Sequence, residues 1–520
     1  MPAARVLTAL VGLLVVVLAA CSASPPAPSP KPEVTPTTVP SLPAKGRPVQ
    51  PVPDVRPAGF ADPPPGQGLE RYERQSLSWR SCARNLTCAT VLAPLDYDDP
   101  DATAVTLALA KRSATAADRL GTLFVNPGGP GGSGRGYVSG FDARGLERYD
   151  VVGWDPRGVG GSTPVTCFGA ADLDRYFSVD VSPDDAAEQQ ALRAETYAFG
   201  ASCLARSGPL LAHISTTSTV GDLDLLRSLV GDPRLNYFGA SYGTKIGALY
   251  AQLFPDRVGH LVLDGAVNIS GSEVSQVEGF ERALDHFADW AATDADGGHP
   301  LGTSKTEVLD RIKTLLTGLD AAPLQVGERQ LSQQQGVQGV LDPLYGRGDW
   351  PVLLRALDQA SSGNGRDLLA LADAGNYRGS NGSYGQINYA FPAIRCEDSQ
   401  AASVPAAERS AERAVAKAPL LGPLVGPDLT CPLWPVAPAP KEPKITAPGA
   451  APIVVVGTTG DPATPYENAV GMARQLSSGV LVTLEGEGHT GYGQSSCVRD
   501  LVHAYLVQDR VPPDGVRCTS

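Results

Sequence analysis

The order of apolar and amphipathic segments predicts an α/β fold, with a mostly parallel sheet covered by helices on both faces. Two observations indicate it. Short apolar runs alternate with segments of helical spacing, as βαβ units require. A glycine-flanked serine at residues 239–243 also follows one of these runs, where a strand would turn sharply into a helix. The expected strands cover residues 105–110, 121–126, 150–154, 235–240, 260–264, 453–457 and 480–484.

The pattern changes between residues 269 and 448, where helical segments are broken by proline and glycine. Leu309, Ile312 and Leu316, for example, have the spacing of one helix face. We therefore expect a mainly helical lid at 269–448, inserted between a first part of the sheet domain at 66–268 and a C-terminal part at 449–520.

The N-terminus has the features of a lipoprotein signal. A short, singly positive lead precedes an apolar stretch at 6–20, too short to cross a bilayer comfortably. Leu-Ala-Ala-Cys at 18–21 is a lipobox, so residues 1–21 are expected to be the signal segment, with Cys21 lipidated. An ordinary secretory signal with a chance cysteine is the alternative. Residues 22–65, rich in Pro, Ala and Ser, are expected to form an extended tether.

The cysteine count agrees with export. Nine cysteines minus Cys21 leave eight, an even number that suits an oxidising compartment. Eight cysteines allow 105 pairings. Spacing favours Cys82–Cys88, Cys167–Cys203, Cys396–Cys431 and Cys497–Cys518, with buried free thiols as the alternative for any pair. The expected location is the extracytoplasmic face of the cell membrane, held by the lipid, with part of the protein secreted.

The net charge of −13 argues against a nucleic-acid partner and against a polybasic membrane contact. The sequence has no His-Glu-x-x-His or other metal-ligand spacing, so neither a metal nor a cofactor is expected.

Ser241, at the centre of the glycine-flanked turn, is the candidate nucleophile. Flanking glycines let strand and helix approach closely and hold the hydroxyl at the tip of the turn. A structural serine in a tight turn is the alternative. A serine hydroxyl is scarcely ionised at neutral pH, so this chemistry needs an adjacent base.

His489 is the expected base, because it alone among six histidines follows the last predicted strand in a glycine-rich loop. Asp461, after the preceding strand, is the expected acid that orients the imidazole, and the order Ser, Asp, His fits this fold. Asp264, at the end of an earlier strand, is the rival. Thr464 could hold the Asp461 loop through a hydrogen bond.

The glycine-rich loop at 128–134 is the expected oxyanion loop, since acyl transfer needs backbone N–H groups aimed at the developing negative oxygen. The expected donors are the amides of Gly129 and Tyr242. Residues 129–134 also satisfy Gly-x-Gly-x-x-Gly, with Asp155 about 20 residues on, as a dinucleotide site would require. Two points favour the oxyanion interpretation. Dinucleotide cofactors are scarce where an exported protein works, and the Ser-His-Asp set needs this same loop.

Together these motifs resemble the tripeptidyl aminopeptidases, exported actinobacterial α/β-hydrolases related to proline iminopeptidases. The resemblance rests on residues 126–134, 155–160 and 239–243, with the Gly-Asp and Gly-His pairs at 460–461 and 488–489, and it covers about Tyr72 to Cys518. Pro127 stands where many α/β-hydrolases carry histidine, but the glycines after it are intact. The resemblance implies an α/β-hydrolase fold with a lid, peptide substrates cleaved from a free N-terminus in units of three residues, and a structural role for Asp155 and Arg157.

An aminopeptidase must meet the substrate's ammonium with carboxylates. Glu397 and Asp398 in the lid resemble a family motif and are the expected partners, with Glu487 near His489 as a further carboxylate. The alternative is a solvated lid face or an ion pair with Arg395. Two other function classes stay open at this point. One is an exported esterase or lipase with the same triad, and the other is a catalytically silent binding protein on the same scaffold.

Overall fold

A computed structural model describes residues 47–271, 274–296, 298–400 and 403–519. The predicted signal segment, Cys21 and the first part of the predicted tether lie outside these residues. Within them, no helix combines the length and the apolar character needed to cross a membrane.

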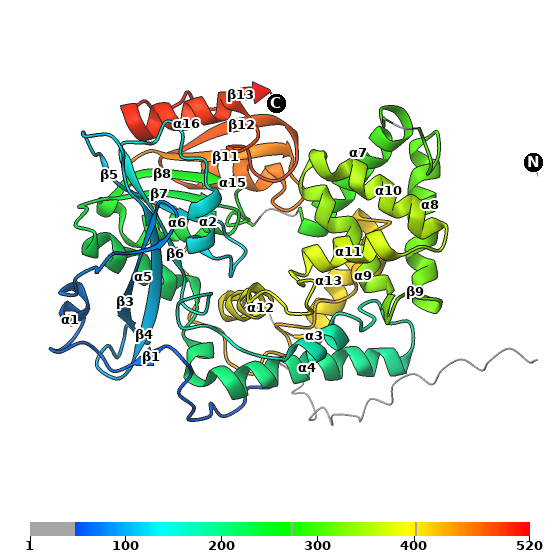
Figure 1. Ribbon diagram of the computed structural model, residues 1–520, viewed down its shortest axis with the longest axis horizontal. Helices are drawn as coiled ribbons and strands as arrows, with labels where there is room; N and C mark the ends of the chain where they lie inside the picture. The colour runs from blue at the N-terminus through cyan, green and yellow to red at the C-terminus, as the bar shows by residue number, and fades with distance from the viewer. Residues whose placement is uncertain (1–46, 272–273, 297, 401–402, 520) are drawn as a thin grey trace, which may run out of the picture. The chain divides into compact units, whose positions relative to one another are not determined.

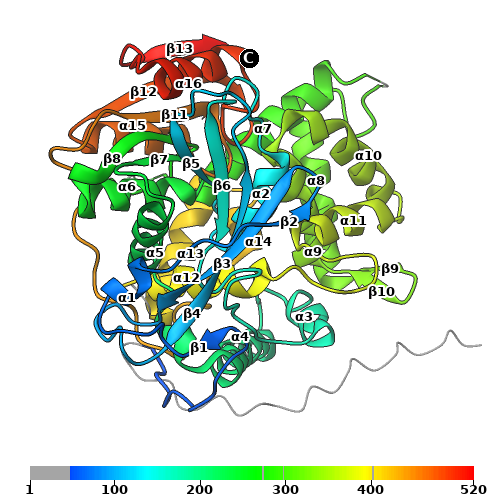
Figure 2. The same ribbon diagram turned by 60° about the vertical axis from the view of Figure 1, so that its left-hand side comes forward.

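The core is one twisted sheet whose central strands are parallel, as predicted (Figures 1 and 2). Its order is β13-β12-β11-β8-β7-β5-β6-β4-β3-β2, with β1 paired to β4. The seven parallel strands are β5 (Gly121–Asn126), β6 (Tyr149–Asp155), β7 (Leu235–Ala240), β8 (Val258–Asp264), β11 (Ile453–Gly460), β12 (Gly479–Glu487) and β13 (Val516–Thr519). Antiparallel neighbours extend one side: β1 (Phe60–Ala61), β2 (Arg80–Ala83), β3 (Leu86–Pro94) and β4 (Ala104–Arg112).

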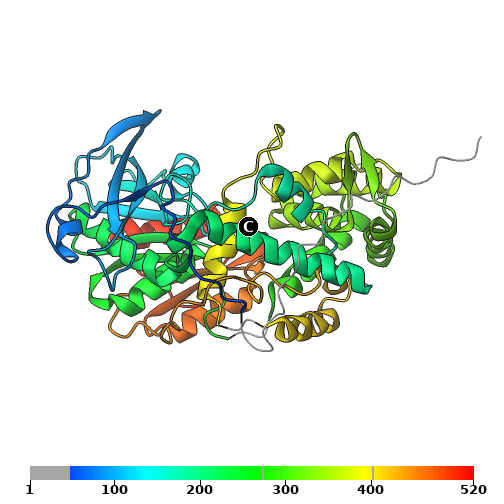
Figure 3. The ribbon, with the colours of Figure 1, turned by 90° about the horizontal axis from the view of Figure 1, so that it is seen from below.

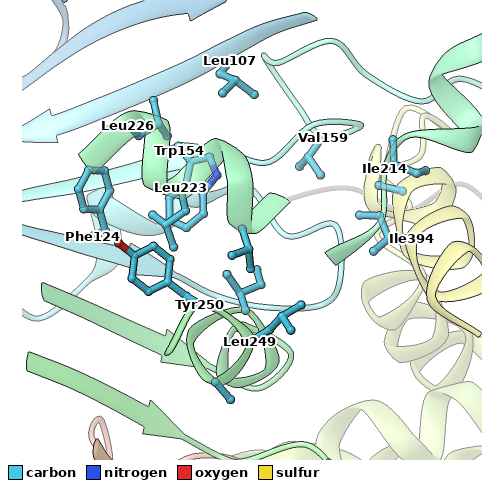
Figure 4. Close-up of a cluster of buried hydrophobic side chains, with 14 of the residues drawn as sticks. Leu107, Phe124, Trp154, Val159, Ile214, Leu223, Leu226, Leu249, Tyr250 and Ile394 are labelled. Carbon is cyan, nitrogen blue, oxygen red and sulfur yellow. The ribbon is translucent and has the colours of Figure 1, made fainter. Parts of the chain in front are cut away.

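Helices cover both faces of this sheet because its central strands are apolar on both sides. On one face, β-strand residues such as Phe124 and Trp154 pack with Leu223, Leu226 and Leu249 of the covering helices (Figure 4). The helices of this face are α5 (Thr216–Leu229), α6 (Gly243–Leu253) and α15 (Tyr466–Gln475). The other face carries α2 (Gly134–Gly140) and α16 (Ser496–Gln508). Short helical turns α1 (Glu70–Glu73), η1 (Gly208–Ala212) and η2 (Pro255–Arg257) complete this domain.

The predicted lid interval is helical and has its own apolar core. Its elements are α7 (Gln276–Thr293), α8 (Lys305–Ala321), the hairpin β9 (Leu324–Val326) and β10 (Arg329–Leu331), α9 (Gln333–Leu341), η3 (Asp342–Tyr345), η4 (Arg347–Asp349), α10 (Trp350–Ser361), α11 (Arg366–Gly375), α12 (Ile387–Asp398), α13 (Val404–Lys417) and α14 (Gly422–Val425).

A second excursion, which we did not predict, leaves the sheet between β6 and α5. It contains α3 (Ala170–Tyr176) and the long helix α4 (Ala186–Ser207), seen in Figure 3. Its residues bind lid residues: Arg378 Nε donates to Asp174 at 2.8 Å, and Ser182 Oγ donates to Gln333 at 2.6 Å. The first core part at 66–268 is therefore not all sheet domain, because this excursion packs with the lid.

The predicted tether boundary at residue 65 is wrong. Arg47 is buried and donates to the carbonyls of Cys396 and Ser399, both at 2.6 Å, where cations are favoured at the end of α12. The amide of Gln50 donates to the Pro435 carbonyl, and Phe60 and Ala61 form β1. The globular unit therefore includes residues from Arg47 onward.

All four predicted disulfides are present: Cys82–Cys88, Cys167–Cys203, Cys396–Cys431 and Cys497–Cys518. The second fixes the start of the α3–α4 excursion to α4, and the third ties α12 to the segment after α14. Both therefore restrain elements that pack around the lid.

Candidate active site

Ser241 lies at the sharp turn between β7 and α6. Its backbone is left-handed, with φ of +54°, and its amide donates to the Asp264 carbonyl at 2.8 Å. A Cβ on Gly239 would come within 2.4 Å of the Gly243 carbonyl oxygen, so only glycine fits there. The turn thus holds Ser241 at the carboxyl end of the sheet in a conformation that L-residues rarely adopt.

His489 follows β12 and is oriented by Asp461, which follows β11. The Nδ1 atom of His489 lies 3.0 and 2.9 Å from the two Asp461 carboxylate oxygens. The Asp461 side chain is fully buried, whereas the His489 side chain is 14% exposed. This geometry makes Nδ1–H the donor to Asp461 and leaves Nε2 available as a base.

Thr464 holds the Asp461 carboxylate, as we expected it could. Its hydroxyl donates to Asp461 Oδ2 at 2.8 Å, and its amide donates to Oδ1 at 2.8 Å. The amides of Ala463 and Thr490 also donate to the carboxylate, at 3.0 and 3.2 Å. These bonds stabilise the ionised acid in a buried position.

Asp264, the rival acid, performs a different task. Its buried carboxylate accepts hydrogen bonds from the amides of Gly491 at 2.8 Å and Tyr492 at 2.9 Å. Burial raises the pKa of Asp264 to about 6, although these two amides oppose the rise. Asp264 therefore anchors the segment that follows His489 and makes no hydrogen bond to the imidazole.

The end of β8 joins these parts into one site. The Asp264 carbonyl accepts from the Ser241 amide, and a Cβ on the next residue, Gly265, would lie 3.2 Å from His489 Cε1. Ser241 and His489 thus flank the same strand end.

The electrostatics of His489 suit a base held by an acid. Burial lowers the pKa of the imidazole, but the adjacent Asp461 charge and hydrogen bond outweigh burial, and the pKa is raised above the ordinary 6.5. Asp461 therefore stabilises the imidazolium that forms when the ring accepts a proton.

The loop at 128–134 lies directly against the Ser241 turn. A Cβ on Gly128 would come within 2.5 Å of the Ala240 carbonyl oxygen and 2.7 Å of the Tyr242 amide. The amides of Gly129 and Tyr242 donate to no other residue in the part of the chain that the structure describes. Two unpaired N–H groups beside the serine are what an oxyanion site requires.

Asp155 braces this loop. It accepts hydrogen bonds from Ser133 Oγ at 2.6 Å and from the Gly161 amide at 2.8 Å, and Ser133 caps α2. Arg157 is fully buried against Asp222. Both residues therefore have the structural role that the resemblance implied.

The structure does not support the predicted ammonium partners. Asp398 is in an ion pair with Lys245 at 2.8 Å and accepts from the Thr216 amide at 2.9 Å. Glu397 is 2% exposed, and burial, followed by the charge of Asp398, raises its pKa to about 8. Glu397 is therefore buried at the end of α12, and Asp398 is held there by Lys245 of α6 and Thr216 of α5.

Two further charged residues named in the sequence analysis, Arg395 and Glu487, have other partners. Arg395 pairs with Asp428 instead of either carboxylate. Glu487 pairs with His286 of α7 at 3.0 Å.

One residue next to the site gave no signal in the sequence. The carbonyl of Tyr345, in η3 of the lid, accepts from the His489 amide at 2.9 Å. Its ring stands edge-on to the imidazole, with centroids 5.5 Å apart. This contact is set by the packing of the lid, so no local pattern could have predicted it.

Two acidic groups have the spacing to hold a metal ion, Asp180 with Glu188 and Asp320, and Asp184 with Asp185 and Glu188. They share no residue with the site around Ser241.

Comparison with known proteins gave two family models and several long relatives. A model described as "TAP-like protein" matches residues 418–518, and one described as "alpha/beta hydrolase fold" matches residues 121–304. The chain is 36% identical over 489 residues to a serine protease named Hip1 from Mycobacterium tuberculosis, which covers 89% of this chain and 93% of that protein.

Two further relatives carry different names. A Streptomyces lividans protein named tripeptidyl aminopeptidase is 30% identical over 483 residues, 86% of this chain and 87% of that one. A Mycobacterium tuberculosis protein named carboxylesterase B is 37% identical over 474 residues, 85% of this chain and 89% of that one.

Proposed function

Because the chain belongs to the tripeptidyl aminopeptidase family of α/β-hydrolases, we propose that it is a serine peptidase that releases tripeptides from free N-termini. Ser241, His489 and Asp461 are the proposed triad, and the amides of Gly129 and Tyr242 the oxyanion donors. The observation that carries the proposal is the buried Asp461 carboxylate on His489 Nδ1, beside a left-handed serine turn.

The first half-reaction is acylation. Ser241 Oγ attacks the carbonyl carbon of the scissile bond, and His489 Nε2 accepts the hydroxyl proton. The carbonyl oxygen takes the negative charge between the two amides. When the intermediate collapses, the C–N bond breaks and His489 gives its proton to the leaving amine.

The second half-reaction restores the enzyme. Water attacks the ester carbonyl, His489 accepts a proton from that water, and the tetrahedral intermediate again lies between the two amides. The C–O bond to Ser241 then breaks, and the proton passes from His489 to Ser241 Oγ. The N-terminal peptide leaves with a new carboxylate.

An esterase is the second candidate, because attack on an ester needs the same parts and one relative is named carboxylesterase B. The two candidates separate on substrates. Purified protein should be profiled on tripeptidyl, monopeptidyl, N-acetyl-tripeptidyl and acyl-ester chromogenic substrates. We expect the free tripeptidyl substrate to give the highest kcat/KM, whereas a preference for the acyl ester over every peptide would move the assignment to an esterase.

We also propose that the protein is a lipoprotein anchored through Cys21 on the extracytoplasmic face of the membrane. The lipobox and the four disulfides support this location. Cys21→Ala should move the protein out of the membrane fraction and abolish incorporation of labelled palmitate. Unchanged membrane association of that variant would overturn the proposal.

A further inference from the structure

Asp342 is a lid carboxylate that no described residue satisfies. It begins η3, is half-buried, and neither accepts a hydrogen bond nor forms an ion pair within the described part of the chain. Two other lid carboxylates, by comparison, have cationic partners: Asp398 has Lys245, and Asp373 has Arg329 at 2.6 Å. A partly desolvated carboxylate without a partner is costly unless a ligand supplies one.

Asp342 begins the short helix η3, which ends at Tyr345, and it also lies close to the end of α11, shortly before Tyr377. Its Oδ1 would be 3.2 Å from a Cβ on Gly375, the last residue of α11, two residues before Tyr377. Burial and then the charge of Asp342 raise the pKa of Tyr377. The pKa of Tyr345 is raised to about 12 by burial and by the charges of Tyr377, Asp461 and Asp342. The shared helix and the close approach to Gly375 put Asp342 near both tyrosine residues, and the direction of the two pKa shifts agrees with this placement.

These tyrosines are open to solvent at the edge of the candidate active site. Tyr345 is 43% exposed and Tyr377 is 57% exposed. Tyr345 also contacts His489 through its carbonyl and its ring. The Tyr345 ring therefore forms part of the surface beside the imidazole.

Two arginines in this part of the lid, both among the described residues, already have acidic partners. The nearby Arg378 is in an ion pair with Asp174, at 2.8 Å, and Arg329 is in the pair with Asp373. An ammonium ion is attracted both by a carboxylate and by the faces of aromatic rings.

We propose that Asp342, with Tyr345 and Tyr377, binds the α-ammonium group of the peptide substrate; this inference rests on the proposed function. Asp342 thus takes the role that we expected for Glu397 and Asp398, which lie at the end of α12 in contact with the interior. A Lys or Arg side chain of a substrate offers similar chemistry, so the test includes both sources of the cation.

The experiment compares kcat/KM for four tripeptidyl anilides, with a free or an acetylated N-terminus and with alanine or lysine at the internal position. Four proteins are measured: the parent, Asp342→Asn, Asp342→Glu and Asp310→Asn. Asp310 is an exposed carboxylate on α8 of the lid, so it controls for a general loss of negative charge. Melting temperatures establish that each variant is folded, and Asp342→Glu provides a conservative charge-retaining variant.

We expect the ratio of free to acetylated substrate to fall about 10- to 100-fold in Asp342→Asn, since a hydrogen bond to a charged group is lost. Asp310→Asn should keep the parent ratio, and Asp342→Glu should retain part of it. If Asp342→Asn is folded and keeps the parent ratio, the inference is wrong while the proposed function stands. If Asp342→Asn loses only a preference for lysine, the site binds a side chain and the inference is also wrong. If the parent itself cleaves free and acetylated peptides equally, the proposed aminopeptidase function fails.

Discussion

The imidazole of His489 must be neutral to accept the serine proton. Its pKa is raised, because the effect of Asp461 outweighs that of burial. We therefore expect kcat/KM to fall as the pH drops through a value above 6.5, the ordinary pKa of histidine.

Asp461→Asn tests which acid orients the imidazole. It should lower kcat by about 10⁴ and move the acid limb of the pH profile to lower pH, because the stabilising charge is gone. Asp264→Asn should cost much less, since its carboxylate contacts backbone amides of the following loop. Both variants should be measured with a tripeptidyl substrate after their folding is checked. A larger loss in folded Asp264→Asn would transfer the role to Asp264.

Glu397 supplies a stability prediction with a defined sign. Its pKa rises from 4.5 to about 8 in the folded state, first through burial and then through Asp398, so the folded protein binds the extra proton. The free energy of unfolding should therefore decrease as the pH rises from about 4.5 to about 8. Glu397→Gln should remove this decrease, whereas the exposed Glu328→Gln should not. The free energy of unfolding is measured in urea at each pH. If it decreased with pH equally in Glu397→Gln and in the parent, the prediction would be wrong.

Sequence patterns could predict some residue roles in the candidate site but not others. Ser241, Asp461 and His489 could be predicted because each follows an apolar strand in a glycine-containing loop. The role of Glu397 and Asp398 could not, because Lys245, which pairs with Asp398, and Arg47, whose charge acts on Glu397, come from distant segments.

At the scale of elements, the contact between the 128–134 loop and the Ser241 turn should be the most sensitive to substitution. Gly128 has φ of +86°, and any Cβ there would collide with the Ala240 carbonyl and the Tyr242 amide. Gly128→Ala should displace the oxyanion donors and lower kcat by about 10²–10³. Gly140→Ala at the end of α2, where a Cβ meets nothing within 4 Å, is the matched control. Equal kcat for both variants and the parent would show that this loop does not take part.

The strands were predictable because central parallel strands are apolar on both faces and stand out as short continuous runs. The α3–α4 excursion was missed since α4 is rich in alanine and buries only scattered apolar residues, among them Leu192, Phe199 and Leu204. The β2–β3 hairpin was also missed, because all four residues of β2 are exposed. Arg47 was assigned to the tether because its neighbours are rich in proline.

At the scale of the whole molecule, Arg157 links separate parts of the core. Its guanidinium binds Asp222 of α5 and the carbonyls of Leu95, Pro94 and His213, and both charged side chains are fully buried. The segment after β6, the end of β3 and α5 therefore meet at this one side chain.

Arg157→Ala should lower the free energy of unfolding by about 3–5 kcal/mol, because it leaves Asp222 buried without its partner. The double variant Arg157→Ala/Asp222→Ala should lose less than the sum of the two single variants. Urea unfolding measures both, with exposed Arg234→Ala as the control. A loss in Arg157→Ala no larger than that of the control would contradict the structural role.

The central claim is that Ser241 forms the acyl-enzyme, and a fluorophosphonate probe tests it most directly. Intact protein should gain one adduct, mapped by peptide mass spectrometry to Ser241, and should lose tripeptidyl hydrolysis in proportion to labelling. Ser241→Ala should fold, stay unlabelled and be inactive. Retained turnover in folded Ser241→Ala, or an adduct on another residue that tracks the loss of activity, would contradict the account.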